Sequence, residues 1–231
     1  MTAPAASSSV KHVLVVGASR GIGLEFVRQY RAAGVGVTAT ARSAAALDTL
    51  RALGAQAIEL DVTRLDSTAA LAWQVDGAGF DVAIVNAGVY GPDKDALQAP
   101  TEAEFDEVMH TNVLGAMRVI PQIVDALAPA ARLAVLSSRM GAIGPRTAGN
   151  GWLYRASKAA LNSVLKDVSL ALGPRAACVS FHPGWVRTDM GGAGADLDVA
   201  RSVSDMRRVI DGLTLADSGR FLNHDGTAIG W

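Results

Sequence analysis

Short apolar runs alternate along this chain with longer segments in which apolar residues recur at helical spacing. The apolar runs cover residues 13–16, 35–41, 57–60, 82–85, 133–136 and 178–181, and the helical segments cover 21–33, 43–53, 64–76, 102–128 and 151–172. Because the runs are largely apolar and do not alternate strictly with polar residues, each strand is expected to be covered on both faces, as in a parallel sheet. The alternation therefore predicts an α/β fold, in which helices cover both faces of a doubly wound, mostly parallel sheet.

Local signals mark where helices should begin and where one should bend. Thr101 and Glu104 form a T-x-x-E pattern, which predicts a capping box at the start of the 102–128 segment. Thr63 and Asp66 predict a weaker version before the 64–76 segment. Pro121 lies inside the 102–128 segment, where it is expected to kink the helix.

The pattern along the chain favours one domain. There is no proline- or serine-rich linker and no block of charge, so residues 11–231 are expected to fold together. Residues 1–10 are expected to form a flexible tail and not a secretory signal, because they contain no apolar core. Residues 189–219 open with closely spaced glycines and continue into a helical pattern, which favours a substrate lid at the carboxyl edge of the sheet. A helix packed permanently over that edge is the alternative.

Charge and composition exclude several classes of function. The 231 residues hold 21 lysines and arginines against 22 aspartates and glutamates, so no excess of positive charge attracts nucleic acid or an anionic membrane. No stretch free of charged residues exceeds 11 residues, whereas a spanning helix needs about 20 apolar ones. Cys178 is the one cysteine, and the four histidines show no metal-binding spacing. These features predict a cytoplasmic protein that binds no metal, nucleic acid or membrane.

Glycines follow the first apolar run in the sequence VLVVGASRGIGLEF. Gly17, Gly21 and Gly23 lie between a predicted buried strand and an amphipathic helix. A tight turn, close backbone approach to a pyrophosphate and helix–strand packing each require a residue without a Cβ. The helix N-terminus then offers free N–H groups to phosphate oxygens. This placement predicts a dinucleotide site, with an ordinary strand–helix turn as the alternative.

The residues after the second apolar run indicate which dinucleotide fits. An NAD site usually carries a carboxylate there, but the first one after Glu25 is Asp48, well beyond the strand. Arg42 stands in its place, and Arg20 lies inside the glycine loop. A guanidinium can bind a 2′-phosphate through two hydrogen bonds, so the pattern favours NADP(H). Taken singly, either arginine could equally be a solvated surface charge.

A second group of polar residues indicates acid–base chemistry. Tyr154 and Lys158 are four residues apart in a helical segment, so both lie on one helix face. A nearby ammonium and an oxidised nicotinamide are expected to lower the tyrosine pKa from near 10. Ser138 follows the fifth apolar run, where its hydroxyl could hold a substrate oxygen. The alternatives are a surface Tyr–Lys pair and a serine that serves only the turn.

With these motifs, the chain resembles the classical short-chain dehydrogenases/reductases over nearly its whole length. Its C-terminal sequence GRFLNHDGTAIGW is similar to that of the small carbonyl reductases grouped with sniffer and the C-factor-like bacterial proteins. The resemblance implies a single Rossmann domain with a seven-stranded, mostly parallel sheet. It also implies that Asn112, Ser138, Tyr154 and Lys158 are catalytic. The residues implied to contact the cofactor are Gly17, Ser19, Arg20, Gly21, Ile22, Gly23, Arg42, Asp61, Val62, Asn86, Ala87, Gly88, Tyr154, Lys158, Pro183, Gly184, Val186 and Thr188.

The resemblance also implies a mechanism. Hydride passes from NADPH to a ketone or aldehyde carbon, and Tyr154 donates the proton to the developing alkoxide. Ser138 orients the carbonyl oxygen, and Lys158 lowers the Tyr154 pKa and holds the nicotinamide ribose. Asn112 holds a water that relays protons, Asp61 contacts the adenine ring, and Thr188 contacts the nicotinamide amide. Relatives pair through their long helices, so the 102–128 and 151–172 segments are expected to form a homodimer or homotetramer.

Two departures from the family pattern bear on the site. Val16 stands where a threonine usually braces the glycine loop, and the 139–153 loop is longer than in many relatives. Four large side chains near the catalytic motifs are expected either to line an apolar substrate pocket or to serve as packing. They are Met140, Trp152, Trp185 and Met190.

Two other functions compete with the reductase. A hydrolase built on Ser138, His182 and an aspartate lacks the G-x-S-x-G turn that such a serine needs. An NADP(H)-binding regulator with little turnover is the alternative from another class, and the intact Ser–Tyr–Lys set argues against it.

Overall fold

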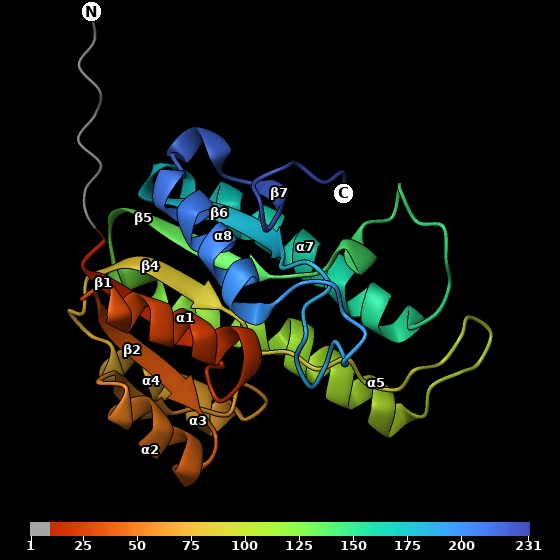
Figure 1. The fold of residues 1–231 in the computed structure, drawn as a ribbon, viewed down its shortest axis with the longest axis horizontal. Helices are drawn as coiled ribbons and strands as arrows, with labels where there is room; N and C mark the ends of the chain where they lie inside the picture. Colours follow the sequence, from red (N-terminus) through yellow and green to blue (C-terminus); the bar gives the residue numbers. More distant parts are fainter. Residues whose placement is uncertain (1–9) are drawn as a thin grey trace, which may run out of the picture.

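A computed structural model describes residues 10–231. The predicted tail, residues 1–10, lies outside the described residues except for Val10. Within the described chain, seven parallel strands form one sheet in the order β3-β2-β1-β4-β5-β6-β7 (Figure 1). The strands are β1 His12–Val16, β2 Gly36–Ala41, β3 Gln56–Glu59, β4 Phe80–Val85, β5 Leu127–Leu136, β6 Ala176–His182 and β7 Arg220–Asn223. The predicted doubly wound parallel sheet is therefore confirmed.

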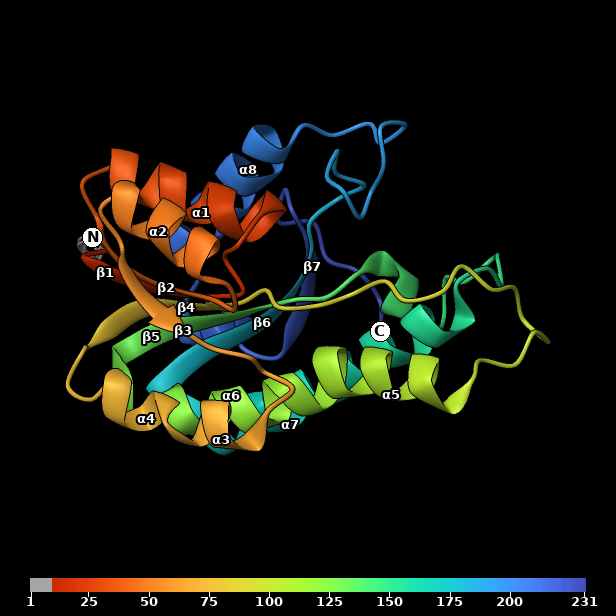
Figure 2. The ribbon, with the colours of Figure 1, turned by 90° about the horizontal axis from the view of Figure 1, so that it is seen from below.

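Helices cover both faces of this sheet, as Figure 2 shows edge-on. The helices α1 Gly21–Ala32, α2 Ala44–Ala52 and α8 Val199–Gly212 lie on one face. The helices α3 Leu65–Ala69, α4 Leu71–Gln74, α5 Glu102–Met109, α6 Gly115–Ile123 and α7 Trp152–Leu172 lie on the other side. Alternate residues of β1 reach opposite cores, since Val13 and Val15 join one cluster while Leu14 and Val16 join the other. This explains why residues 13–16 of β1 are apolar without alternation.

The prediction of one kinked helix over 102–128 is wrong. The segment contains α5, a π-helical turn η1 (His110–Leu114), α6 and a 3₁₀ turn η2 (Val124–Ala126), after which β5 begins at Leu127. The interruption lies at η1, upstream of Pro121, which α6 contains. The start is as predicted: the Thr101 hydroxyl accepts from the Glu104 N–H, and the Glu104 carboxylate accepts from the Thr101 N–H.

The single helix expected over 64–76 is also wrong, because two short helices, α3 and α4, fill this segment. The predicted weak cap by Thr63 is absent from the described chain. The Thr63 hydroxyl instead donates to the carboxylate of Asp61 at 2.7 Å, so it stabilises the turn after β3. The helix α3 starts after Arg64 without a side-chain cap.

The segment predicted as a lid has two unlike parts. In α8, the side chains of Val203, Met206 and Ile210 are fully buried in the same core cluster as α1. Residues 186–198 instead form a largely irregular segment beyond the carboxyl end of β6. An opening lid would therefore consist of 186–198, with α8 as its fixed base. No helix of the described residues has the length and apolar character needed to cross a membrane.

Candidate active site

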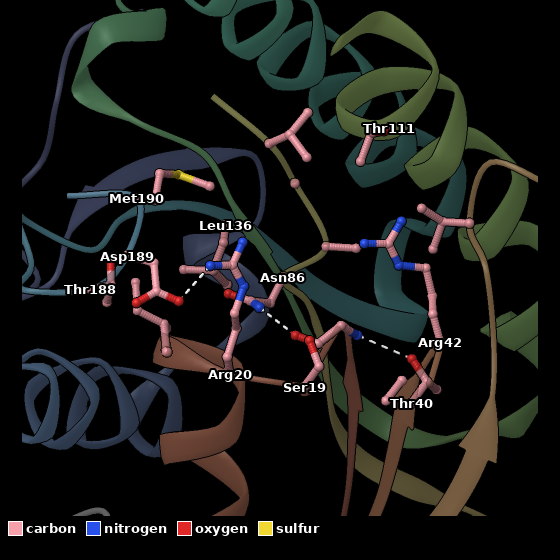
Figure 3. Close-up of a pocket in the computed structure, with 18 of the residues that line it drawn as sticks. Ser19, Arg20, Thr40, Arg42, Asn86, Thr111, Leu136, Thr188, Asp189 and Met190 are labelled. Atoms are coloured by element: carbon pink, nitrogen blue, oxygen red, sulfur yellow. Dashed lines mark hydrogen bonds and ion pairs between the residues drawn. The ribbon is translucent and has the colours of Figure 1, made fainter. Parts of the chain in front are cut away.

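A cavity opens over the carboxyl ends of β1, β2 and β4, beside the N-terminus of α1 (Figure 3). We call it the glycine-loop cavity. The predicted cofactor residues that line it are Gly17, Ser19, Arg20, Gly21, Ile22, Arg42, Asp61, Val62, Asn86, Ala87, Gly88, Tyr154, Lys158, Pro183 and Thr188. Parallel strands place their carboxyl ends at one sheet edge, so residues distant in sequence converge there.

The glycines of the loop are required by close contacts. Gly17 has a φ of +84°, and a Cβ there would lie 2.7 Å from the backbone of Ala87. Gly23 does not line the cavity, but a Cβ on it would lie 2.3 Å from the carbonyl oxygen of Gly17. The Asn86 amide also donates to that carbonyl oxygen at 2.6 Å. The loop is thus fixed against β4 on one side and α1 on the other.

Thr40 is a cavity residue that the sequence reasoning missed. Its hydroxyl accepts a hydrogen bond from the Gly17 N–H at 3.1 Å, and its side chain is buried. The expected loss of a bracing hydroxyl at Val16 is therefore compensated from the neighbouring strand. A polar residue near the end of an otherwise apolar run was the available signal.

The two predicted arginines occupy different sides of the cavity. Arg42 lies beside Thr40, whereas Arg20 points toward Asp189 (Figure 3). The Arg20 guanidinium donates to the Asp189 carboxylate at 2.5 Å, and both side chains are exposed. Within the described residues, Arg42 has no hydrogen-bonded or ion-paired side-chain partner, so its guanidinium is available to a ligand.

Asp61 is held by the turn that follows β3. Its carboxylate accepts hydrogen bonds from the N–H and the hydroxyl of Thr63. Partial burial opposes ionisation, but these hydrogen bonds and the charges of Arg42 and Arg64 outweigh it and lower the Asp61 pKa. The carboxylate therefore stays charged at the rim of the cavity.

Ser138, Tyr154 and Lys158 come together in the interior, where each side chain is buried. Burial raises the pKa of Tyr154 to about 12, while a hydrogen bond with Ser138 opposes the shift. The ring of Tyr90 lies against that of Tyr154, with centroids 4.7 Å apart. The phenol is therefore protonated at neutral pH.

The sequence analysis expected Lys158 to help lower the Tyr154 pKa, but burial raises this pKa. The position of Lys158 explains why its charge does not prevent the rise. The Lys158 ammonium donates to the main-chain carbonyl of Leu136 at 2.8 Å and lies 5.6 Å from the centre of the Tyr154 ring. Complete burial lowers the pKa of Lys158 to about 8. Desolvation thus acts on both groups and favours the neutral form of each.

Asn112 lies in the π-helical turn, beside this group but outside the lining of the glycine-loop cavity. Its amide oxygen accepts from the Val89 N–H, and its amide nitrogen donates to the Val89 carbonyl and the Ser157 hydroxyl. Asn112 therefore fixes the irregular segment that follows β4 against α7. A Cβ on Gly88 would lie 3.2 Å from the Asn112 amide oxygen and 3.4 Å from the Lys158 ammonium, so the three residues converge.

A second cavity, which we call the outer cavity, meets the first at Tyr154. Ser138, Gly184 and Val186 line the outer cavity, and Tyr154 and Thr188 line both. The large side chains Met140, Trp185 and Met190 also line it, whereas Trp152 does not. Residues 145–148 and Asn150 of the long 139–153 loop form part of its wall. The two cavities therefore adjoin along a wall that includes Tyr154, with Ser138 lining the outer cavity and Lys158 lining the glycine-loop cavity.

Comparison with protein families identifies this arrangement. The family model described as short chain dehydrogenase matches residues 11–196. The chain belongs to the short-chain dehydrogenase family. It is accordingly an oxidoreductase by family, and the resemblance seen in its motifs is confirmed.

Individual relatives agree with this assignment. The C-signal protein of Myxococcus xanthus is 42% identical over 165 residues, which cover 70% of this chain and 99% of that protein. A short-chain dehydrogenase/reductase of Burkholderia multivorans, solved with bound NADP, is 31% identical with a TM-score of 0.86. The carbonyl reductase Sniffer of D. melanogaster is 31% identical with a TM-score of 0.84. Both structural matches cover 96% of this chain and 100% of the other.

Proposed function

We propose that this chain is an NADP(H)-dependent reductase of ketones or aldehydes, able to oxidise the corresponding alcohols. The observation that carries the proposal is the junction of the two cavities at Tyr154, with Ser138 and Lys158 beside it. An acid–base group placed between two cavities can serve a cofactor bound on one side and a substrate bound on the other. The relatives that were solved with NADP or named as carbonyl reductases support the same chemistry.

The residues of the glycine-loop cavity fit a dinucleotide. The loop between β1 and α1 offers main-chain N–H groups and the N-terminus of α1 to a pyrophosphate. Arg42 offers a guanidinium without a carboxylate partner in the described chain, which suits a 2′-phosphate. Arg20 would reach the same phosphate only by leaving Asp189. Asp61 and Val62 would flank the adenine ring, and Pro183, Gly184, Val186 and Thr188 would border the nicotinamide.

The chain's own residues account for the proton transfer. When bound, the reduced nicotinamide supplies a hydride to the carbonyl carbon. The Ser138 hydroxyl holds the carbonyl oxygen, and the Tyr154 phenol donates its proton to that oxygen as charge develops on it. Because the raised pKa keeps Tyr154 protonated and an alkoxide is a stronger base than phenolate, the proton moves toward the substrate. Lys158 lies on the cofactor side of Tyr154, where it would hold the nicotinamide ribose. Asn112 lies in the π-helical turn, where it would hold the water that relays protons.

Replacement of Tyr154 by phenylalanine tests the proposal. The ring and its contact with Tyr90 remain, but the proton donor is lost, so NADPH binding should persist while reduction falls by about a hundredfold or more. Steady-state rates with a panel of ketones and aldehydes, together with NADPH titrations, provide the measurement. A Tyr154→Phe enzyme that reduces a good substrate at the wild-type rate would overturn the assignment.

Three expectations from the sequence complete this proposal. The protein works in the cytoplasm, and it forms a homodimer or homotetramer through α5, α6 and α7, which sedimentation can measure. A lid was expected over residues 189–219; because α8 is packed in the core and Thr188 borders both cavities, we place it in residues 186–198. NADPH should therefore slow hydrogen exchange in 186–198 more than in α8.

A further inference from the structure

Each of two proposed catalytic residues is followed directly by an arginine. Arg139 follows Ser138, Arg155 follows Tyr154, and all four residues line the outer cavity. Arg146 of the long loop adds a third guanidinium, against a single carboxylate, that of Asp93. The whole chain carries a formal charge of −1, so this excess of positive charge belongs to the cavity and not to the protein at large.

Arg155 is the most informative of the three because it is buried, with 9% of its surface exposed. Its Nε donates to the Asn150 carbonyl at 2.7 Å, and one Nη donates to the Asn150 amide oxygen at 3.0 Å. Both partners are neutral, and no carboxylate of the described residues forms an ion pair with it. Burial of a charge is costly unless a counter-charge accompanies it, so the site is electrostatically incomplete without an anion.

Arg139 is the second anchor. It begins the turn after Ser138, its side chain is exposed, and it forms no side-chain hydrogen bond or ion pair within residues 10–231. Asp93 is also exposed, and it accepts only a long hydrogen bond from Tyr90, at 3.4 Å. Most other arginines have a carboxylate partner, as Arg175 has in Asp125. Arg139, Arg146 and Arg155, none of which has a carboxylate partner in the described residues, thus lie together where a substrate would lie.

From these observations we propose that the substrate is a carbonyl compound bearing an anionic group, a carboxylate in the simplest case, which Arg139 and Arg155 bind. This proposal rests on the proposed function, since it names the substrate class of the same site. The carbonyl oxygen lies at Ser138 and Tyr154, and the anion lies beside it against the two arginines. Met140, Trp185 and Met190 pack on the apolar part of the molecule between the two ends.

Matched aldehydes that differ only in charge test the proposal. We compare 3- and 4-formylbenzoate with their methyl esters, using NADPH and measuring kcat/KM. The acid should exceed its ester by at least tenfold for one of the isomers. Arg139→Gln and Arg155→Gln should each lower the acid-to-ester ratio about tenfold, which is the usual effect of losing a charge-assisted hydrogen bond. Arg175→Gln, which changes charge far from the cavity in sequence and in its contacts, should leave the ratio unchanged.

Binding provides a readout that does not depend on turnover. Calorimetry on the NADP⁺-saturated protein, which has no hydride to transfer to an aldehyde, should show the preferred formylbenzoate isomer binding at least tenfold more tightly than its methyl ester. Arg139→Gln keeps the test valid if Arg155→Gln unfolds the loop, because Arg139 is exposed and its side chain makes no hydrogen bond or ion pair to that loop within residues 10–231. Esters that match or exceed the acids in both assays would overturn the anion site while the reductase stands. Tight binding of the acid without reduction of any aldehyde would instead overturn the reductase and support the anion site.

Discussion

The Thr40 hydroxyl accepts a hydrogen bond from the main-chain N–H of Gly17 at 3.1 Å, so β2 braces the loop that follows β1. The Thr40 carbonyl extends the connection by accepting from the Ala18 N–H at 2.8 Å. Because Val16 has no hydroxyl, the neighbouring strand supplies the polar contact that the loop needs. A threonine at the position before the first glycine is therefore not required for an ordered loop in this chain.

Replacement of Thr40 by valine should lower the free energy of unfolding by about 1–3 kcal/mol, because the partly buried Gly17 N–H loses its partner without a change in side-chain shape. NADPH should also bind more weakly, since the loop shapes the phosphate site. Thr40→Ser keeps the hydroxyl and serves as the control. Urea unfolding and NADPH titration of the three proteins provide the measurement. Equal stability of the valine and serine variants would show that the hydrogen bond does not brace the loop.

Gly23 should tolerate no side chain. In Gly23→Ala the new Cβ would lie 2.3 Å from the Gly17 carbonyl oxygen and 2.7 Å from the Asn86 amide nitrogen. We expect a loss of about 3 kcal/mol or more, because the backbone must move apart. Gly212→Ala, also in a helix but with open space around it, should be neutral or stabilising by about 0.5 kcal/mol. Thermal or urea unfolding compares the two, and effects of the same sign would contradict the packing argument.

Arg42 should set the preference for NADPH over NADH. In Arg42→Asp the guanidinium is lost and a carboxylate repels the 2′-phosphate, so the Kd for NADPH should rise at least tenfold while that for NADH changes little. Arg28→Asp makes the same charge change on the exposed side of α1 and controls for long-range charge. Fluorescence titrations of the wild type and both variants with each cofactor give the dissociation constants. Similar losses for NADH and NADPH in Arg42→Asp would remove Arg42 from the phosphate site.

The sequence predicted the parallel sheet well because the sheet depends on a local pattern. Buried parallel strands are largely apolar, as residues 13–16 of β1 are, and such runs stand out. The break at η1 could not be predicted, because the apolar spacing continues through it and only the tertiary contacts of Asn112 with Val89 and Ser157 show its role. The four-residue strand β7 was too short and half polar, so no run marked it.

Side-chain pairings across the site were also beyond the sequence. The ion pair of Arg20 with Asp189 joins residues 169 positions apart, and the buried Arg155 looks like an ordinary surface charge in the pattern YRASK. The expected lowering of the Tyr154 pKa assumed that Lys158 points at the phenol. The Leu136 carbonyl takes the ammonium instead, so burial decides the direction of the shift.

His182, at the end of β6, gives the fold a dependence on pH. Its Nδ1 is buried and has no hydrogen-bond partner within the described residues. Burial, with smaller contributions from the charges of Arg139 and His224, lowers the His182 pKa from 6.5 to about 4. Below pH 6.5 the unfolded chain takes up a proton at this residue, whereas the folded protein does not until about pH 4. Acid therefore favours unfolding across this window, and the stability is regained as the pH rises through it.

His182→Gln should remove that dependence, because glutamine does not titrate. A pKa change from 6.5 to about 4 corresponds to about 3 kcal/mol of stability lost by the wild type between pH 7 and pH 4. Carboxylates lose stability in both proteins alike, so the difference between the two unfolding curves isolates His182. Urea unfolding at pH 7, 5.5 and 4 measures this difference. From pH 7 to pH 4 the free energy of unfolding should fall by about 3 kcal/mol more in the wild type than in the variant. A difference between wild type and variant that stays constant within about 1 kcal/mol from pH 7 to pH 4 would mean that His182 is protonated alike in the folded and unfolded states, and its burial would then have no effect on acid stability.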